Sequence, residues 1–470
     1  MGVTSDRPRR AARARHPEDH TARPPSPDAT REQRELAAAR TALELLFGPV
    51  AERVFAVRLW DGTTDAPDRE EMPRFTLALH DAGSLRRMLL PPSELRICEA
   101  YLRGDYDIEG DVEAATAFGD QVRHRLSSPR AVARLTRALL ELPSLDPGAT
   151  VSSRVADWWR TAAPRHSPER DAAAVRSHYD VGNDFYELWL DRRMVYSCAY
   201  FQTPDASIDA AQEAKLEHLC RKLRLQPGES LLDVGCGWGG LVMYAAERFG
   251  VNAVGITLSP EQAALARARI QAAGLESTCT VEVRDYRHLP LDAAFDKIVS
   301  VGMVEHVGCA SLPTYFSHLY GLLRPGGLLM NHGIVHEPSS PPTLIGRVGA
   351  KIWHEGAFID KYVFPDGELP DLSDIISTAE HAGFETRDVE SLREHYALTL
   401  RHWTARLDRE RERAVASVGE QVYRTWRLYM AASAYGFASG RLRLAQVLLA
   451  KPDTNGSAGV PLTRADIYTS

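Results

Sequence analysis

The chain has 470 residues, a length that accommodates two or three domains of ordinary size. It is 44% hydrophobic and 25% charged, near the average for globular proteins, and its formal net charge is -7. This balance gives no basic signature of nucleic-acid binding. No stretch reaches the roughly 18 consecutive apolar residues of a membrane span, and the N-terminus lacks a secretory signal. We therefore expect a cytoplasmic protein that meets membranes only peripherally.

The six cysteines are scattered along the chain without a CxxC spacing. Neither a zinc site nor a disulfide framework is therefore predicted, and no metal site is expected. Most of these residues should be small buried hydrophobic side chains.

The N-terminal third divides into a tail, a small domain and a linker. Residues 1–34 are rich in Arg and Pro, which predicts a disordered tail in preference to a lipid-headgroup contact. Residues 35–130 have the pattern of a small α+β domain. In it RELAAARTALELLFG has helical apolar spacing, and VFAVRLWDGT and RFTLALHDA alternate like strands around a DG turn signal. Residues 131–172 are interpreted as a linker region.

Residues 173–455 are predicted to form the catalytic domain. Buried-strand runs alternate there with amphipathic helices, and the strands are SLLDVG, NAVGITL, CTVEVRD, FDKIVSV and GGLLMNHGIV. This βαβα order predicts an α/β fold with a doubly wound, Rossmann-like sheet. A loop-rich insertion after 336 predicts a lid over the carboxyl edge of the sheet. The end of the domain is predicted to be mostly helical, and 456–470 a C-terminal tail.

The first predicted strand runs directly into a glycine-rich turn, Gly235–Gly240, followed by a helix. Glycine permits the tight turn and lets the backbone approach a ligand closely at the carboxyl end of the strand. The pattern is DxGxGxG, unlike the GxGxxG of dinucleotide enzymes, and Asp233 is placed to fix the turn amides or to meet a cationic ligand. It resembles the first motif of class I S-adenosylmethionine methyltransferases. The alternative is a glycine turn that only packs helix on strand.

The next two predicted strands end at further candidate contacts. The second ends without the acidic residue that many nucleotide-binding sheets place there. The following Ser-Pro-Glu-Gln has capping-box spacing, so Gln262 is interpreted either as a helix cap or as a ligand contact. Asp285 and Tyr286, which end the third strand, are placed to meet an adenine.

Six segments, in this order, resemble the cyclopropane fatty acid synthase family, which includes the mycolic acid cyclopropane synthases. They are HYDVGNDFYELWLDRRMVYSCAYF, LLDVGCGWGG, GITLSPEQ, GMVEHVG, LRPGG and KYVFPDGELP, within 170–450. The resemblance implies that S-adenosylmethionine is the methyl donor. Its implied contacts are Tyr196, Ser197, Gly235, Cys236, Gly237, Trp238, Gly239, Thr257, Leu258, Gln262, Asp285 and Tyr286. The small domain is more loosely similar to the N-terminal domain of full-length members, which is thought to engage lipid or a partner subunit, and a homodimer is compatible with the resemblance.

The resemblance also implies a bicarbonate ion beside the substrate. Its positions fall on Cys198, Glu305, His332, Ile334 and Tyr396. The Glu305, His332 and Tyr396 side chains would orient the ion by hydrogen bonds, whereas Cys198 and Ile334 would contribute backbone groups and shape. Cys198 is therefore not expected to be a nucleophile, although its thiol is expected to be open to blocking reagents. His178 and His306 are expected to be structural.

The implied reaction transfers a methylene unit to the cis double bond of unsaturated phospholipid acyl chains. Attack of the alkene on the activated methyl group leaves a carbocation, and bicarbonate removes a proton so that a cyclopropane closes. Water would trap the cation, so the pocket must be dry. Aromatic faces can stabilise the cation, although each such side chain is equally well explained as core. The candidates are Tyr179, Phe185, Tyr186, Trp189, Tyr200 and Phe201.

A phospholipid substrate implies docking at the bilayer surface, for which Arg192 and Arg193 form one candidate basic face. Three alternatives stay open. A close relative could direct the cation to a 10-methylene-branched or hydroxylated chain, although the retained EHVG segment favours the ring. A small-molecule C-methyltransferase would leave Cys198, His332 and Tyr396 without a joint explanation. A non-catalytic lipid-binding protein would not need Glu305.

Overall fold

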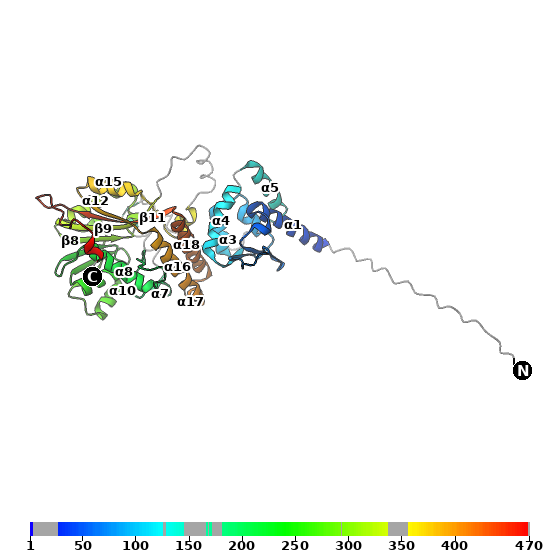
Figure 1. Ribbon diagram of the computed structural model, residues 1–470, viewed down its shortest axis with the longest axis horizontal. Coiled ribbons are helices and arrows are strands. Elements are labelled where there is room, and N and C mark those ends of the chain that lie inside the picture. The colour runs from blue at the N-terminus through cyan, green and yellow to red at the C-terminus, as the bar shows by residue number, and fades with distance from the viewer. Residues whose placement is uncertain are drawn as a thin grey trace.

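The computed structural model describes residues 1–2, 27–125, 128–144, 166–167, 169–171, 181–292, 294–336 and 356–468. Most of the predicted tail, much of the predicted linker and residues 337–355 of the predicted lid lie outside these ranges. The described chain forms two folded units that pack side by side (Figure 1). The N-terminal unit spans 27–144, and the C-terminal unit spans 181–468.

The N-terminal unit is a small α+β domain, as predicted. Its four-stranded sheet has the order β2-β1-β3-β4. The strands are β1 (Ala56–Arg58), β2 (Thr64–Asp65), β3 (Phe75–Leu79) and β4 (Tyr106–Gly110). The helices are α1 (Pro27–Phe47), η1 (Val50–Glu52), α2 (Ser84–Leu89), α3 (Glu94–Arg103), α4 (Val112–Arg125) and α5 (Pro129–Leu140). Phe55 stacks on Phe75 with ring centroids 4.7 Å apart and anchors the core of this domain.

Three details of this domain differ from the sequence prediction. Helix α1 begins at Pro27, inside the predicted tail, and α5 occupies the start of the predicted linker, where it packs against α1. The turn at Asp61 and Gly62 leads from β1 into the short β2, and the two longer predicted strands, β1 and β3, pair in parallel. Apolar burial against the sheet, which a local pattern does not reveal, extends the domain at both ends.

The C-terminal unit is built on a seven-stranded sheet with the order β10-β11-β9-β8-β5-β6-β7. Its strands are β5 (Ser230–Val234), β6 (Asn252–Thr257), β7 (Cys279–Val283), β8 (Phe295–Val301), β9 (Leu323–His336), β10 (Glu385–Ser391) and β11 (Leu442–Ala450). Neighbours from β7 to β9 pair in parallel, whereas β11 runs antiparallel to both β9 and β10. This confirms the predicted doubly wound sheet.

Helices cover both faces of this sheet (Figure 1). They are α7 (Asn183–Glu187), α8 (Ile208–Lys222), α9 (Gly240–Phe249), α10 (Pro260–Ala272), η3 (Tyr286–His288), α11 (Val304–Val307), η4 (Cys309–Ser311), α12 (Leu312–Leu322), α14 (Ala357–Tyr362), α15 (Leu372–His381), α16 (Arg393–Arg409), α17 (Arg411–Val418), α18 (Glu420–Ser439) and α19 (Ala465–Tyr468). Leu231 packs in the core under α8, α9 and α10, and its neighbour Leu232 packs in the core under α12 and α15. The alternation follows from the two-residue period of a strand.

The end of the domain is mostly helical, as predicted, because α16, α17 and α18 follow β10, but the sequence analysis missed β11, which completes the sheet. Strand β11 follows α18, whose helix ends at Gly440 in the left-handed conformation. The last seven residues of β11 are all buried. A short apolar run buried on both faces cannot be told from a helix by periodicity alone.

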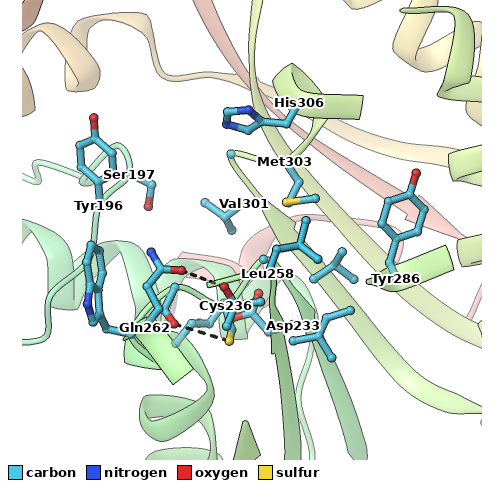
Figure 2. A pocket seen from close by; sticks show the side chains of 18 of the residues that line it. Tyr196, Ser197, Asp233, Cys236, Leu258, Gln262, Tyr286, Val301, Met303 and His306 are labelled. Carbon is cyan, nitrogen blue, oxygen red and sulfur yellow. Dashed lines mark hydrogen bonds between the residues drawn. The ribbon is translucent and has the colours of Figure 1, made fainter. Parts of the chain in front are cut away.

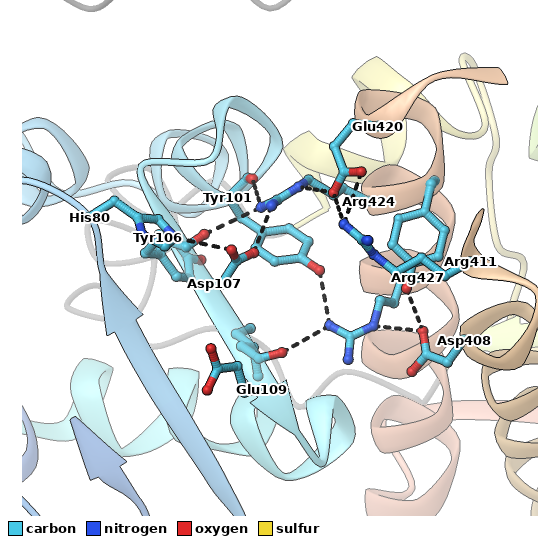
Figure 3. Close-up of polar contacts among 12 residues, drawn as sticks. His80, Tyr101, Tyr106, Asp107, Glu109, Asp408, Arg411, Glu420, Arg424 and Arg427 are labelled. Atoms are coloured by element: carbon cyan, nitrogen blue, oxygen red, sulfur yellow. Dashed lines mark hydrogen bonds and ion pairs between the residues drawn. The ribbon is translucent and has the colours of Figure 1, made fainter. Parts of the chain in front are cut away.

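Helix α18 joins the two folded units through Arg424 and Arg427 (Figure 3). The Arg424 guanidinium donates to the carbonyl of Tyr101 at 2.9 Å and pairs with Asp107 at 2.7 Å. The Arg427 guanidinium donates to the Tyr101 hydroxyl, to the carbonyl of Ile108 and to the Asp408 carboxylate. The apolar core is also continuous across this junction. The N-terminal domain is therefore fixed to the helices that cover the carboxyl edge of the sheet.

No helix in the described part of the chain is long and apolar enough to cross a bilayer.

Candidate active site

A cavity opens at the carboxyl ends of β5, β6 and β8, where the predicted glycine turn leads into α9. All of the predicted cofactor contacts except Gly239 line it. Figure 2 shows Tyr196 and Ser197 on one side of the cavity and Tyr286 on the other, with Asp233, Cys236 and Gln262 between them. Ligands bind in doubly wound sheets at this edge.

Two glycines of the turn have different structural roles. Gly235 has φ +85°, and a Cβ there would lie 2.5 Å from Cγ of Met303, so the backbone has no room for a side chain. Gly239 also has positive φ, but a Cβ there would lie 3.2 Å from Cβ of Ala266 in α10. Gly239 therefore allows close helix packing beside the cavity, and the prediction that it contacts the cofactor has no support in the cavity lining.

Gln262 is oriented by side chains of β6 and its loop. The Ser259 hydroxyl accepts from the backbone N–H of Gln262, which is the N-cap bond that the sequence predicts. The Gln262 side chain instead accepts from the Thr257 hydroxyl at 2.8 Å, and that hydroxyl also accepts from the N–H of Ser259. The cap is thus made by Ser259, and the Gln262 side chain lines the cavity.

Two buried charges of opposite sign lie in the cavity wall. Burial raises the pKa of Asp233 to about 7, although the nearby Lys215 opposes the shift. Burial also lowers the pKa of Lys215 to about 8, against the opposing charges of Asp191 and Asp233. The Lys215 ammonium donates to the Ser197 hydroxyl at 3.0 Å. Sequence analysis missed Lys215, which lies on a helix of mixed composition where a lysine is usually exposed.

Salt bridges hold the mouth of the cavity. The Arg287 guanidinium pairs with Asp285 at 2.6 Å and with Asp171 at 3.0 Å. His166 and His306 also line the cavity, and burial, with a further contribution from His166, lowers the pKa of His306 to about 4. His306 is therefore neutral at the cavity wall, where sequence analysis expected only a structural residue. His178 lies outside the described residues.

A second group of polar atoms lies on α11 and β9. Glu305 Oε1 accepts from the backbone N–H of Ile334 at 2.7 Å, and burial raises the pKa of Glu305 to about 7. On β9 the His332 Nδ1 meets the Gln446 side chain at 3.1 Å. Glu305 Oε2 and His332 Nε2 are both buried and have no hydrogen-bond partner.

Buried polar atoms in folded proteins nearly always have a partner. A carboxylate oxygen and an imidazole nitrogen that both lack a partner are therefore the candidate contacts for a polar ligand. The N–H of Ile334 is already taken by Glu305, so Ile334 positions the carboxylate. None of the five predicted catalytic residues is among the described residues that line the cofactor cavity.

Cys198 and Tyr396 lie in one apolar cluster, against which Ile334 packs. The loop that carries Cys198 is attached to α16, because the Ala199 N–H donates to the Thr399 hydroxyl and the Phe201 N–H donates to His395 Nδ1. The Cys198 side chain is 0% exposed, and burial raises the pKa of its thiol. The expectation of a reagent-sensitive Cys198 therefore does not fit this structure, in which Cys309 is the exposed thiol.

Aromatic rings from four elements pack on one another in a cluster around Tyr196, called the aromatic cluster below. Its members are Phe185, Tyr186, Trp189, Tyr196, Trp403 and Trp426. Three of them were sequence candidates, whereas the indoles of α16 and α18 were missed because nothing local links them to this loop. Tyr200 and Phe201 stack instead on histidines of α8 and α16, and Tyr179 lies outside the described residues.

The predicted basic docking face at Arg192 and Arg193 is neutralised by neighbouring carboxylates. Arg192 pairs with Asp209 at 3.7 Å, and Arg193 pairs with Glu213 at 3.3 Å and with Glu247 at 3.6 Å. Since each arginine has an acidic partner, this segment carries no excess of positive charge.

The strand order, the glycine turn and the cavity at the carboxyl edge define a class I S-adenosylmethionine-dependent methyltransferase. Comparison with known proteins gives the particular family. The family model described as mycolic acid cyclopropane synthetase matches residues 166–447, and a domain of unknown function matches residues 42–118. The chain belongs to the cyclopropane synthase family.

Individual relatives extend this assignment. A probable fatty acid methyltransferase of Pseudomonas putida is 43% identical over 92% of this chain and 100% of the relative. The cyclopropane-fatty-acyl-phospholipid synthase of Escherichia coli is 36% identical over 62% of this chain and 71% of that enzyme. The crystal structure of mycolic acid cyclopropane synthase CmaA1 complexed with SAH and CTAB is similar with a TM-score of 0.55, at 34% identity, over 59% of this chain and 97% of that one.

Proposed function

We propose that this protein transfers a methylene unit from S-adenosylmethionine to the cis double bond of unsaturated phospholipid acyl chains and closes a cyclopropane ring. The observation that carries the proposal is the pair of unpartnered buried atoms, Glu305 Oε2 and His332 Nε2. The names of the Escherichia coli and CmaA1 relatives support the same reaction class.

The cavity fits S-adenosylmethionine. A Cβ at Gly237 of its turn would meet nothing within 4 Å, and its wall holds a carboxylate at Asp233 and an ammonium at Lys215, which suit the charged amino-acid end of this molecule. Asp285 and Tyr286 lie where the adenosine end would be held. When bound, S-adenosylmethionine supplies a methyl group activated by its sulfonium, which a weakly nucleophilic alkene requires.

The second group of polar atoms fits bicarbonate. A hydrogen carbonate ion has a hydroxyl that donates and oxygens that accept, and the site presents one carboxylate acceptor, Glu305 Oε2, and one imidazole nitrogen, His332 Nε2. When bound, bicarbonate supplies a base that is not covalently attached to the chain. Glu305 and His332 orient that base, and the Ile334 N–H holds the carboxylate in place.

We propose that the aromatic cluster keeps water away from the reacting part of the acyl chain. Phe185, Tyr186 and Trp189 are each 0% exposed, so no solvent reaches their rings. Their ring faces favour a positive charge that develops on the acyl chain. Exclusion of water prevents hydration of that charge, which would divert the product to an alcohol.

The proposed substrate is part of a bilayer, so we infer that the protein acts at the inner membrane surface as a peripheral protein. With Arg192 and Arg193 paired to carboxylates, the docking face is expected elsewhere on the chain. A homodimer is proposed on family grounds only.

The test is to express the protein in a bacterium that makes unsaturated phospholipids but lacks its own cyclopropane synthase, and to analyse the fatty acids by mass spectrometry and proton NMR. A mass gain of one methylene with high-field ring-proton signals is the expected result. Unchanged lipids, produced by folded protein that binds S-adenosylmethionine, would overturn the lipid assignment in favour of a small-molecule C-methyltransferase.

The second candidate product is a 10-methylene-branched acyl chain. It is favoured by the name of the Pseudomonas putida relative, which describes a fatty acid methyltransferase and no ring-forming synthase. The same mass gain with vinylidene proton signals would identify this product. All the residues proposed above would keep their roles up to the formation of the cation.

A further inference from the structure

A line of buried polar side chains leads from His332 of β9 across one face of the sheet to β11 and β10. Gln446 on β11 lies directly opposite His332 of β9 in the antiparallel register. Its amide meets His332 Nδ1 at 3.1 Å, and its Oε1 accepts from the Lys222 ammonium of α8 at 3.0 Å. His332, Gln446 and Lys222 are 2%, 0% and 1% exposed. Water is therefore not a competing partner for any of them.

The direction of each hydrogen bond in this line follows from its lysine end. An ammonium has three donors and no acceptor, so the Gln446 atom that faces Lys222 must be the carbonyl oxygen. The amide NH2 then faces His332, and Nδ1 must accept. A flipped amide would turn NH2 toward the ammonium and place two donors face to face.

The lysine itself is fixed by carboxylates of β10. Its Nζ lies 3.1 Å from Asp388 and 2.5 Å from Glu390, and Glu390 is also bonded to His218 at 2.7 Å. Two negative partners hold the ammonium in place beside Gln446. The Lys222 ammonium is therefore held in place as the donor to Gln446 Oε1.

We propose that Lys222 and Gln446 are positioning residues that hold His332 as the neutral tautomer with its proton on Nε2. The tautomer of a histidine is set by the hydrogen bond at its other nitrogen. With Nδ1 accepting from Gln446, the single proton resides on Nε2, the atom that has no partner in the site. This inference rests on the proposed function for the identity of the group that Nε2 meets.

The surroundings of His332 also oppose a second proton. Burial lowers the pKa of His332 well below its usual value, and the positive charges of Lys215 and Lys222 lower it further. A neutral ring has one N–H only, so the hydrogen bond from Gln446 decides which side of the ring donates.

The locked tautomer would define what the site selects. Nε2–H donates to an oxygen of the ligand, while Glu305 Oε2 accepts from it when ionised. One donor and one acceptor suit an anion that carries a hydroxyl. Formate and acetate carry no hydroxyl, so they would leave an ionised Glu305 without a donor, and the site should prefer hydrogen carbonate to them.

The tautomer can be measured directly in the full-length protein labelled with ¹⁵N-histidine. Long-range proton–nitrogen NMR distinguishes protonated from bare ring nitrogens, and His332→Gln identifies the His332 signals by their loss. The wild-type protein is expected to show Nε2 protonated and Nδ1 bare. Lys222→Met and Gln446→Met should both shift the signals toward the Nδ1-protonated form or a mixture of the two tautomers.

Lys451→Met is the matched control. Lys451 directly follows β11, and its ammonium donates to the carbonyls of Tyr320 and Leu323. Its substitution therefore removes a partly buried, hydrogen-bonding lysine near the same sheet without changing a partner of His332, Gln446 or Lys222. Its His332 signals should match the wild type. Gln446→Met keeps the carboxylate partners of Lys222, so this variant still tests the tautomer of His332 if Lys222→Met does not fold.

Activity gives the second readout. Both variants should lower kcat by about twofold to tenfold, in step with the fraction of molecules that lose the Nε2 proton in the NMR spectra, with the KM for S-adenosylmethionine changed by less than about twofold. A wild-type His332 with its proton on Nδ1, or variants that retain the wild-type signals, would overturn the inference. The NMR result needs no substrate, so it stands apart from a failure to find a cyclopropane product, which would overturn only the proposed function.

Discussion

Two groups of buried polar side chains in this molecule differ in how completely they are hydrogen-bonded. At the domain junction, Arg424 and Arg427 lie among carbonyls, a phenol and carboxylates that accept from them (Figure 3). Behind the cofactor cavity, Glu305 and His332 each keep one buried atom without a partner.

The difference separates a structural role from a binding role. A buried polar group that is fully bonded stabilises one arrangement of the chain, whereas one left open costs free energy unless a ligand completes it. The junction therefore holds the N-terminal domain on α18, whereas the proposed function gives the open pair an anion as its missing partner.

The largest effect is expected at the open pair. Glu305→Gln keeps an oxygen for the Ile334 N–H but replaces the acceptor Oε2 by an NH2 group, so turnover should fall by about 10³-fold. Methyl transfer from labelled S-adenosylmethionine into unsaturated phospholipid measures it. Glu394→Gln, which changes an exposed carboxylate on α16, is the control and should retain the wild-type rate.

Substitution of the fully bonded arginines at the domain junction should lower the free energy of unfolding. Arg427→Met leaves the Tyr101 hydroxyl, the Ile108 carbonyl and Asp408 without their shared donor, and we expect a loss of about 4 kcal/mol in the free energy of unfolding. Urea unfolding measures it. Arg411→Met, which removes an arginine whose side chain is 53% exposed, should cost much less. Equal losses in the two variants would mean that burial at the junction adds nothing.

The pH dependence of stability should show the cost of ionising the buried Glu305 carboxylate. Burial raises its pKa from 4.5 to about 7 in the folded protein. Between these values the folded chain holds a proton that the unfolded chain has released, so stability falls as pH rises toward 7 by up to about 3 kcal/mol. Glu305→Gln removes this dependence and should melt at a higher temperature than wild type at about pH 8. A lower melting temperature at that pH would contradict the assignment.

The smallest effect is expected at the predicted docking face. The Arg192 side chain is 80% exposed, and its carboxylate partner Asp209 also pairs with Arg406. Arg192→Ala should therefore change the free energy of unfolding by less than about 0.5 kcal/mol and should leave vesicle binding unaltered. Cosedimentation with anionic vesicles measures the second quantity, and a marked loss of binding there would restore this face as the membrane contact.

The sequence supports the prediction of those parts of the structure that depend on local pattern. Strands β5 to β9 were predictable because each is a buried run beside a helix with clear apolar spacing, and the turn at Gly235 because no other residue fits its backbone. The open pair at Glu305 and His332 was proposed from family resemblance. Its exact bonding required the structure.

The remainder depends on tertiary packing. Lys215 and Lys222 lie on α8 in a stretch rich in charged residues, where a lysine is normally exposed. Only the fold buries Lys215 in the cavity wall and Lys222 against β10 and β11. Strand β11 was missed because its apolar run follows a long helix. Trp403 and Trp426 join the aromatic cluster from helices more than two hundred residues away from Trp189 in sequence.

The most direct test of the central claim is the dependence of the reaction on bicarbonate. Purified protein is assayed with S-adenosylmethionine and vesicles of unsaturated phospholipid in buffer freed of carbon dioxide, and bicarbonate is then added back. The rate should fall by at least about tenfold without bicarbonate and recover on its addition, and Glu305→Gln should stay inactive in both buffers. A wild-type rate that does not change with bicarbonate would contradict the role assigned to Glu305 and His332.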